Sequence, residues 1–124
     1  MARGRHLLVD LTQVPHDSLA DADKVVDLMK RAARQAGATV QGALWTELDP
    51  PGFAAVVLLN ESHLSLHVFA EERIAALDVF CCGRADPRVA VEIICSELGG
   101  IITNAEERPR FLEKPPGEDE ENSP

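Results

Sequence analysis

The sequence is poor in aromatic side chains, which limits how its core can be built. It contains four Phe, one Trp and no Tyr among 124 residues. A chain of this length is the size of one domain and can bury a single modest core. Because rings are scarce, we expect aliphatic side chains to fill that core.

Positive charge is also in short supply. The chain has 12 basic and 21 acidic residues, a formal net charge of −9. Such a surface repels phosphate backbones, and no cluster of Lys and Arg offsets it locally, so we expect no binding to nucleic acid. A cationic small molecule would be attracted to it.

Long apolar runs and paired cysteines are missing as well. The longest apolar run, residues 53–59, is too short to cross a bilayer, and no signal peptide is visible, so we expect no membrane association. The three cysteines, Cys81, Cys82 and Cys95, suggest neither a disulfide framework nor a CxxC zinc site. We expect reduced thiols, no bound metal and a cytoplasmic location.

The hydrophobic pattern predicts an alternation of strands and helices. We expect strands at 6–11, 39–48, 53–59, 63–69, 75–82 and 101–105, and helices at 18–36 and 86–98. Ser18 or Asp21 could cap the first helix, and Gly37 ends it. Residues 53–59 are apolar almost throughout, which predicts a strand buried on both faces.

This order predicts an α/β (α+β) two-layer sandwich, a mainly antiparallel sheet with two helices on one face. The other sheet face then needs cover, and a second copy of the chain is the simplest source. We expect one domain over residues 1–112. Residues 113–124, part of an acidic segment with nothing to bury, are predicted to be a disordered tail.

Residues 60–67, with the sequence N-E-S-H-L-S-L-H, gather a carboxylate, two hydroxyls and two imidazoles between two predicted strands. Cys82 follows at the end of a later strand. Taken alone, this pattern fits a nucleophile, base and acid set, or simply the polar face of an exposed sheet, which is the commoner explanation.

Residues 61–67 (E-S-H-L-S-L-H) and 78–83 (D-V-F-C-C-G) resemble the bacterial and archaeal S-adenosylmethionine decarboxylases. The pattern of that family is E-S-H-x-[ST]-x-H, then D-x-F-x-C-G at the same separation. Residues 4–7 (G-R-H-L) match the family's opening, and 37–39 (G-A-T) fit after the first helix. The resemblance covers residues 4–108.

The resemblance implies a proenzyme that cuts itself between Glu61 and Ser62. Ser62 Oγ would attack the carbonyl of Glu61, and elimination would release Glu61 as a carboxylate and leave a dehydroalanine. Its rearrangement and hydrolysis with loss of ammonia would leave a pyruvoyl group, the cofactor, at the start of the new chain. The pieces 1–61 and 62–124 would stay together in one sheet. His67 matches the base of this processing, and an imidazole suits that task near neutral pH.

In the decarboxylation that the resemblance implies, the pyruvoyl ketone forms a Schiff base with the substrate amine and acts as an electron sink. Cys82 matches the proton donor. Phe69, Glu71 and Leu48 match substrate-binding positions, although relatives carry an aromatic residue at the position of Leu48. Relatives also often have a processing serine where this chain has Ala54.

The family further implies a homodimer of cleaved protomers that supplies the aminopropyl donor for spermidine synthesis. Two alternatives stay open because the pocket residues depart from the family's pattern. The chain could be a pyruvoyl-dependent decarboxylase of arginine or ornithine, or a non-catalytic regulatory paralogue. Intact Ser62, His67 and Cys82 argue against the regulatory paralogue.

Overall fold

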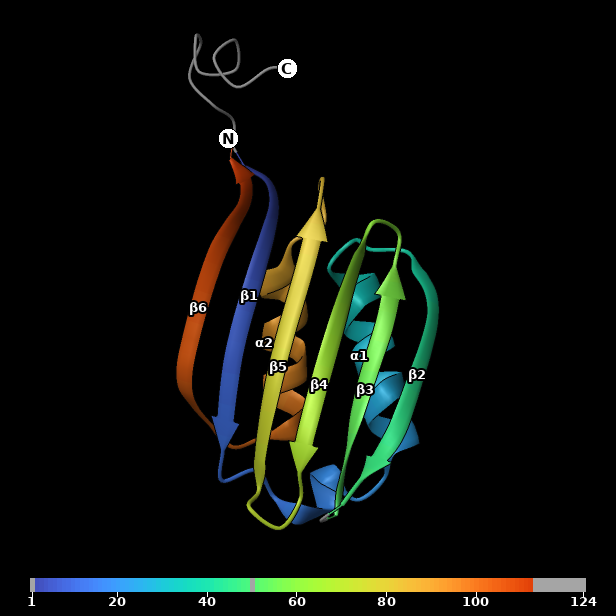
Figure 1. Cartoon of the computed structure of the whole chain (residues 1–124), viewed down its shortest axis with the longest axis vertical. Coiled ribbons are helices and arrows are strands. Elements are labelled where there is room, and N and C mark those ends of the chain that lie inside the picture. Colours follow the sequence, from blue (N-terminus) through green and yellow to red (C-terminus); the bar gives the residue numbers. More distant parts are fainter. Residues whose placement is uncertain (1, 50, 113–124) are drawn as a thin grey trace, which may run out of the picture.

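The computed structural model describes residues 2–49 and 51–112 (Figure 1). The predicted tail, 113–124, lies outside the described residues. The elements along the chain are β1 (Ala2–Thr12), the short 3-10 helix η1 (His16–Leu19), α1 (Ala22–Gln35), β2 (Val40–Leu48), β3 (Gly52–Leu59), β4 (Ser62–Phe69), β5 (Ile74–Cys82), α2 (Pro87–Leu98) and β6 (Ile101–Leu112). No helix in these described ranges is long and apolar enough to cross a membrane.

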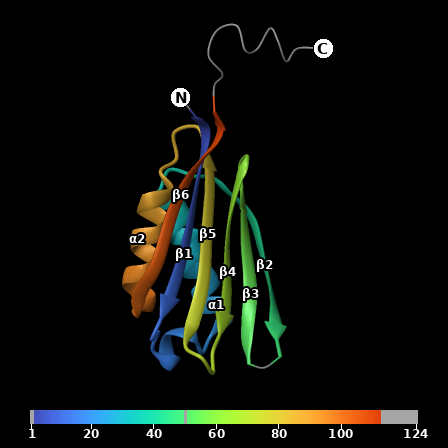
Figure 2. The same ribbon diagram turned by 60° about the vertical axis from the view of Figure 1, so that its left-hand side comes forward.

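The six strands form one sheet in the order β2-β3-β4-β5-β1-β6, and each neighbouring pair is antiparallel. Both α1 and α2 lie against the same side of this sheet, which Figure 2 shows obliquely. The predicted two-layer sandwich is therefore confirmed. The other side of the sheet, hereafter the open face, has no helix over it.

Three elements differ from their predicted bounds by more than one residue, and the first of them, β1, begins at Ala2 and not at residue 6. The first helix begins at Ala22, because the Asp21 carboxylate accepts hydrogen bonds from the backbone N–H groups of Asp23 and Lys24 and so caps it. The last strand runs to Leu112, since it pairs with β1 along almost its whole length. Because its residues after 105 are mostly polar and include Pro109, the hydrophobic pattern does not predict this part of the strand.

The core lies between the helices and the inner sheet face, and it is aliphatic as predicted. Its fully buried side chains include Leu11, Met29, Leu64, Leu66 and Ile94, and burying each stabilises the fold by about 1.5–3 kcal/mol. Phe53 is the one aromatic side chain buried in the described part of the chain.

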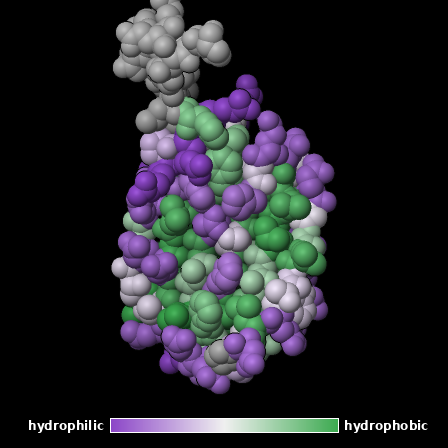
Figure 3. Space-filling model, in the orientation of Figure 1, coloured by the Kyte–Doolittle hydropathy of each residue, from purple (hydrophilic) through white to green (hydrophobic). Residues whose placement is uncertain are grey.

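The prediction that residues 53–59 are buried on both faces is wrong. Burial alternates along β3, and Leu58 on the open face is 54% exposed. The helices cover only one side of the sheet, so a strand in it has only one buried side. Figure 3 views the open face and shows apolar side chains interspersed with polar ones.

Candidate functional site

The Glu61–Ser62 bond lies in a tight hairpin between β3 and β4. Leu59 pairs with Ser62, so the turn has only Asn60 and Glu61 at its tip. Glu61 has a φ of 63°, a left-handed conformation that costs a residue with a side chain about 1–2 kcal/mol. The predicted cleavage point is thus an exposed bond next to a strained residue.

Ser62 begins β4 with its hydroxyl beside this turn. Its Oγ donates a hydrogen bond to the backbone carbonyl of Asn60 at 3.2 Å. The Glu61 side chain lies 3.7 Å from the Arg3 guanidinium, and both side chains are largely exposed. Ser62 therefore lies close to the carbonyls of the turn, as an attack on the Glu61 carbonyl requires.

A cut at this bond would divide the sheet without separating its parts. The first piece would hold β1, α1, β2 and β3, and the second would hold β4, β5, α2 and β6. Yet β1 lies between β5 and β6, and β3 pairs with β4. Every ladder of β1 and one ladder of β3 would then join the two pieces, which explains how they could stay associated.

Cys82 ends β5 at the same end of the sheet as Ser62. His63 pairs with Phe80, and extending that register by two positions sets Cys82 opposite Glu61. Cys82 shares the open face with Phe80 and is partly exposed, whereas Cys81 points into the core. Burial, together with the neighbouring Cys82, raises the pKa of the Cys81 thiol to about 11. Of the two adjacent thiols, Cys82 is the accessible one.

His67 does not lie near Ser62 in the same chain. It sits five positions further along β4 (62 to 67), exposed on the open face between Ala54 and Ala76. At about 3.3 Å per strand residue the separation is about 16 Å. His67 lines a shallow cavity of about 220 Å³ together with Leu44, Trp45, Thr46, Ala54, Ala55, Val56 and Ser65.

The three predicted substrate-binding residues lie still further from Ser62. Leu48 and Phe69 both pair with Gly52, at the end of the sheet opposite the β3–β4 turn. Glu71 is exposed in the turn that follows β4. One chain therefore gathers Ser62 and Cys82 at one end of the sheet, and the substrate-binding residues at the other.

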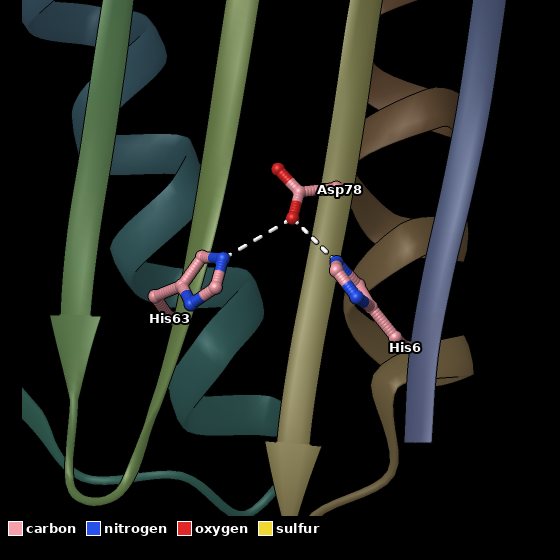
Figure 4. Close-up of side chains that lie close together, drawn as sticks. All are labelled: His6, His63 and Asp78. Carbon is pink, nitrogen blue, oxygen red and sulfur yellow. Dashed lines mark hydrogen bonds and ion pairs between the residues drawn. The ribbon is translucent and has the colours of Figure 1, made fainter. Parts of the chain in front are cut away.

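The structure adds a polar cluster on the open face that sequence reasoning missed (Figure 4). His6 Nε2 lies 2.6 Å and His63 Nε2 3.1 Å from Asp78 Oδ2, and Ser65 Oγ donates to Asp78 Oδ1. The two imidazoles and the carboxylate come from β1, β4 and β5. Only the pairing of those strands brings them together, so their spacing along the chain does not predict the cluster.

The electrostatics of this cluster centre on Asp78. Burial on its own would raise the pKa of this carboxyl group. The hydrogen bonds from Ser65 and His6 and the adjacent His63 outweigh that effect, so the pKa of Asp78 lies below its usual value. Asp78 is thus a carboxylate, which only accepts hydrogen bonds, and both histidines donate to it from Nε2.

No metal-ligand cluster was predicted from the sequence, yet the ligand atoms of His6, His63 and Asp78 lie within 4.8 Å of one another. Arg110 Nη1 lies 3.2 Å from His6 Nδ1, and a guanidinium can only donate. His6 therefore carries its proton on Nε2. A metal on Nε2 would move that proton to Nδ1, facing Arg110, so the contacts favour a hydrogen-bonded network.

Comparison with known proteins gives consistent matches along the chain. The family model described as S-adenosylmethionine decarboxylase matches residues 5–111. The S-adenosylmethionine decarboxylase proenzyme of Symbiobacterium thermophilum is 42% identical over 100 residues, 80% of this chain and 76% of that protein. That of Geobacillus kaustophilus is 35% identical over 109 residues, 88% of each. The crystal structure of the adenosylmethionine decarboxylase from Aquifex aeolicus matches with a TM-score of 0.81 at 28% identity, covering 91% of this chain and 94% of that one.

Proposed function

The chain belongs to the S-adenosylmethionine decarboxylase family, and from this premise we propose that it is a proenzyme that cuts itself between Glu61 and Ser62. Its activity is the decarboxylation of S-adenosylmethionine. The observation that carries the proposal is the strained Glu61–Ser62 hairpin with Cys82 at the same sheet end. The cationic substrate also suits a chain with a net charge of −9.

Ser62 fits the precursor of a pyruvoyl group. Its hydroxyl lies beside the turn whose carbonyl it would attack, and its backbone stays paired with Leu59. Cleavage would release Glu61 from its left-handed conformation. Once formed, the pyruvoyl group would supply the electron sink for loss of carbon dioxide. Cys82 would then provide a proton to the product, which its accessible thiol on the open face allows.

His67 would act as the processing base on a second copy of the chain. About 16 Å along one strand is too far for proton transfer within a chain, which needs hydrogen-bond distance or one bridging water. Two open faces that stack about a two-fold axis across the strands would bring each sheet's far end over the other's near end. His67 of one copy would then approach the Glu61–Ser62 turn of the other.

The same stacking would complete the substrate site. Leu48, Phe69 and Glu71 lie with His67 on the half of the sheet away from Ser62. In the stacked pair they would approach the Ser62 and Cys82 of the other copy. Exposed apolar side chains on the open face support such an interface, since Leu44 is 72% and Leu58 54% exposed.

The pathway that this activity implies is polyamine synthesis, in which the decarboxylated product donates an aminopropyl group to make spermidine. The relatives compared in sequence are named S-adenosylmethionine decarboxylase proenzymes, which does not favour arginine, ornithine or a regulatory role. The domain limits, the tail and the cytoplasmic location stay predictions.

The test is the intact mass of the protein and of Ser62→Ala under denaturing conditions. We expect two fragments split between Glu61 and Ser62, the second without its amino nitrogen, and an uncut variant. The cut protein should then release carbon dioxide from S-adenosylmethionine. Release from arginine or ornithine alone would overturn the substrate, and a full-length wild type would overturn self-processing.

A further inference from the structure

His63 lies between two functional groups of the neighbouring strand, all on the open face. It pairs directly with Phe80, so Asp78 and Cys82 occupy the two diagonal positions on either side of it. Diagonal neighbours on antiparallel strands have Cα atoms about 7–8 Å apart, within reach of long side chains. Across the first of these diagonals, His63 Nε2 already contacts Asp78 Oδ2 at 3.1 Å.

Asp78 decides which nitrogen of His63 remains free. Because the Asp78 carboxylate only accepts hydrogen bonds, His63 carries a proton on Nε2 and keeps Nδ1 for other use. Figure 4 shows that this second nitrogen points along the sheet toward the β3–β4 turn, and so toward the end where Cys82 lies. This is how an acidic residue orients a histidine in a proton-transfer dyad.

We propose that His63, oriented by Asp78, is the proton carrier that reprotonates Cys82 between turnovers. The proposal rests on the proposed function, in which Cys82 gives its proton to the product and is left as a thiolate. A proton then leaves Nδ1 of the His63 imidazolium and joins Cys82 Sγ, directly or through one water. The thiol and a neutral imidazole result, and His63 takes its next proton from solvent.

The surroundings of His63 suit this exchange. Its side chain is 39% exposed in the single chain and lies near the β3–β4 turn, at the end of the sheet, where water can reach it. The charged or titratable groups that face it are Asp78 and Cys82 from β5 and His6 from β1. Arg110 of β6 contacts His6 rather than His63, and β3 contributes the apolar Leu58.

Asp78 is a positioning residue in this scheme, since it touches His63 and not the reacting atoms. Asp78 is itself held in place by hydrogen bonds to both of its carboxylate oxygens, one from His6 and one from Ser65. Arg110 contributes indirectly, because its contact keeps the proton of His6 on Nε2. The cluster therefore orients the His63 imidazole. It fixes one tautomer of His63, so that its free nitrogen is directed toward the end of the sheet that holds Cys82.

The first test combines His63→Gln with Cys82→Ala. His63→Gln keeps an N–H for Asp78 but cannot carry a proton, so we expect normal chain cleavage, an unchanged KM and a kcat about 10–100-fold lower. In a Cys82→Ala background the same change should have no further effect. His16→Gln, on η1, is the matched control. Additive losses in the double variant would overturn the proposal.

A second measurement does not need turnover. With Cys81 and Cys95 replaced by Ala, alkylation of Cys82 in the cleaved protein at pH 7 should be several-fold slower after His63→Gln or Asp78→Asn. Added imidazole should partly restore the kcat of His63→Ala. Unchanged alkylation and no rescue would overturn the role of His63. If Cys82→Ala turns over normally, the proposed donor is wrong instead, and the two failures are thus distinguishable.

Discussion

Thr46 of β2 lies directly opposite Ala54 of β3, and Ala54 pairs on its other side with His67 of β4. All three line the same shallow cavity on the open face. The family resemblance implies a serine hydroxyl at the position of Ala54, which this chain lacks. The Thr46 hydroxyl, one strand away, is the nearest replacement that the register offers.

We therefore predict that Thr46→Val slows chain cleavage by about tenfold, because the cavity that His67 lines would lose a hydroxyl. Ala54→Ser in the same chain should restore the rate. The appearance of fragments during synthesis or refolding, followed by intact mass, measures both. Thr103→Val, an exposed threonine of β6, is the control. Cleavage of Thr46→Val at the wild-type rate would remove Thr46 from the process.

Ser62 and His67 should complement each other between two copies of the chain. Ser62→Ala and His67→Ala should each stay uncut alone, because one lacks the nucleophile and the other the base. When the two are co-expressed, the His67→Ala chain should be cut, since the other copy supplies an intact His67. Intact mass identifies which chain is cut. If mixed chains stay whole, His67 acts within its own chain or not at all.

Cys82→Ala should cut itself normally but decarboxylate S-adenosylmethionine about 100-fold more slowly. The thiol lies on the open face and serves turnover, whereas cleavage depends on the hairpin and on His67. Carbon dioxide release by the cleaved variant gives the measurement. Cys95→Ala on α2, away from the open face, should keep the full rate, and normal turnover by Cys82→Ala would exclude it as the donor.

Asp78 should make stability depend on acid pH. Its pKa is lowered in the folded protein, so its carboxylate stabilises the fold above the unfolded-state pKa, and that contribution is lost as pH falls through the lower folded value. Asp78→Asn should lose about 1–3 kcal/mol at pH 7. The gap to wild type should narrow toward pH 3, as measured by urea unfolding. Asp17→Asn, an exposed control, should show neither effect; a gap independent of pH would contradict the assignment.

Leu58→Glu should prevent the proposed dimer, because its new carboxylate would be buried between the two open faces. The monomer should also remain uncut, since His67 of a second copy could no longer reach Ser62. Gln35→Glu adds the same charge on α1, on the other side of the sheet, and should stay dimeric and cut. Sedimentation measures the oligomeric state, and intact mass measures cleavage. A Leu58→Glu variant that is still dimeric and cut would mean that the interface lies elsewhere.

Much of the fold could be read from the sequence because its signals are local. Alternating burial in β4 and β5 and the amphipathic pattern of α1 are visible in single segments. Local signals failed where the tertiary partner decides. The polar second half of β6 is a strand only because β1 lies beside it, and β3 is exposed on one side because no helix covers the open face.

The motif residues themselves, Glu61, Ser62, His67 and Cys82, came from the sequence, because side-chain chemistry and spacing are written there. Tertiary structure alone decided which of them meet. Strand pairing joined Ser62 to the end of the sheet that holds Cys82 and separated it from His67 by a fixed rise per residue. It also brought His6, His63 and Asp78 into contact from three strands, since register, and not distance along the chain, sets which side chains touch.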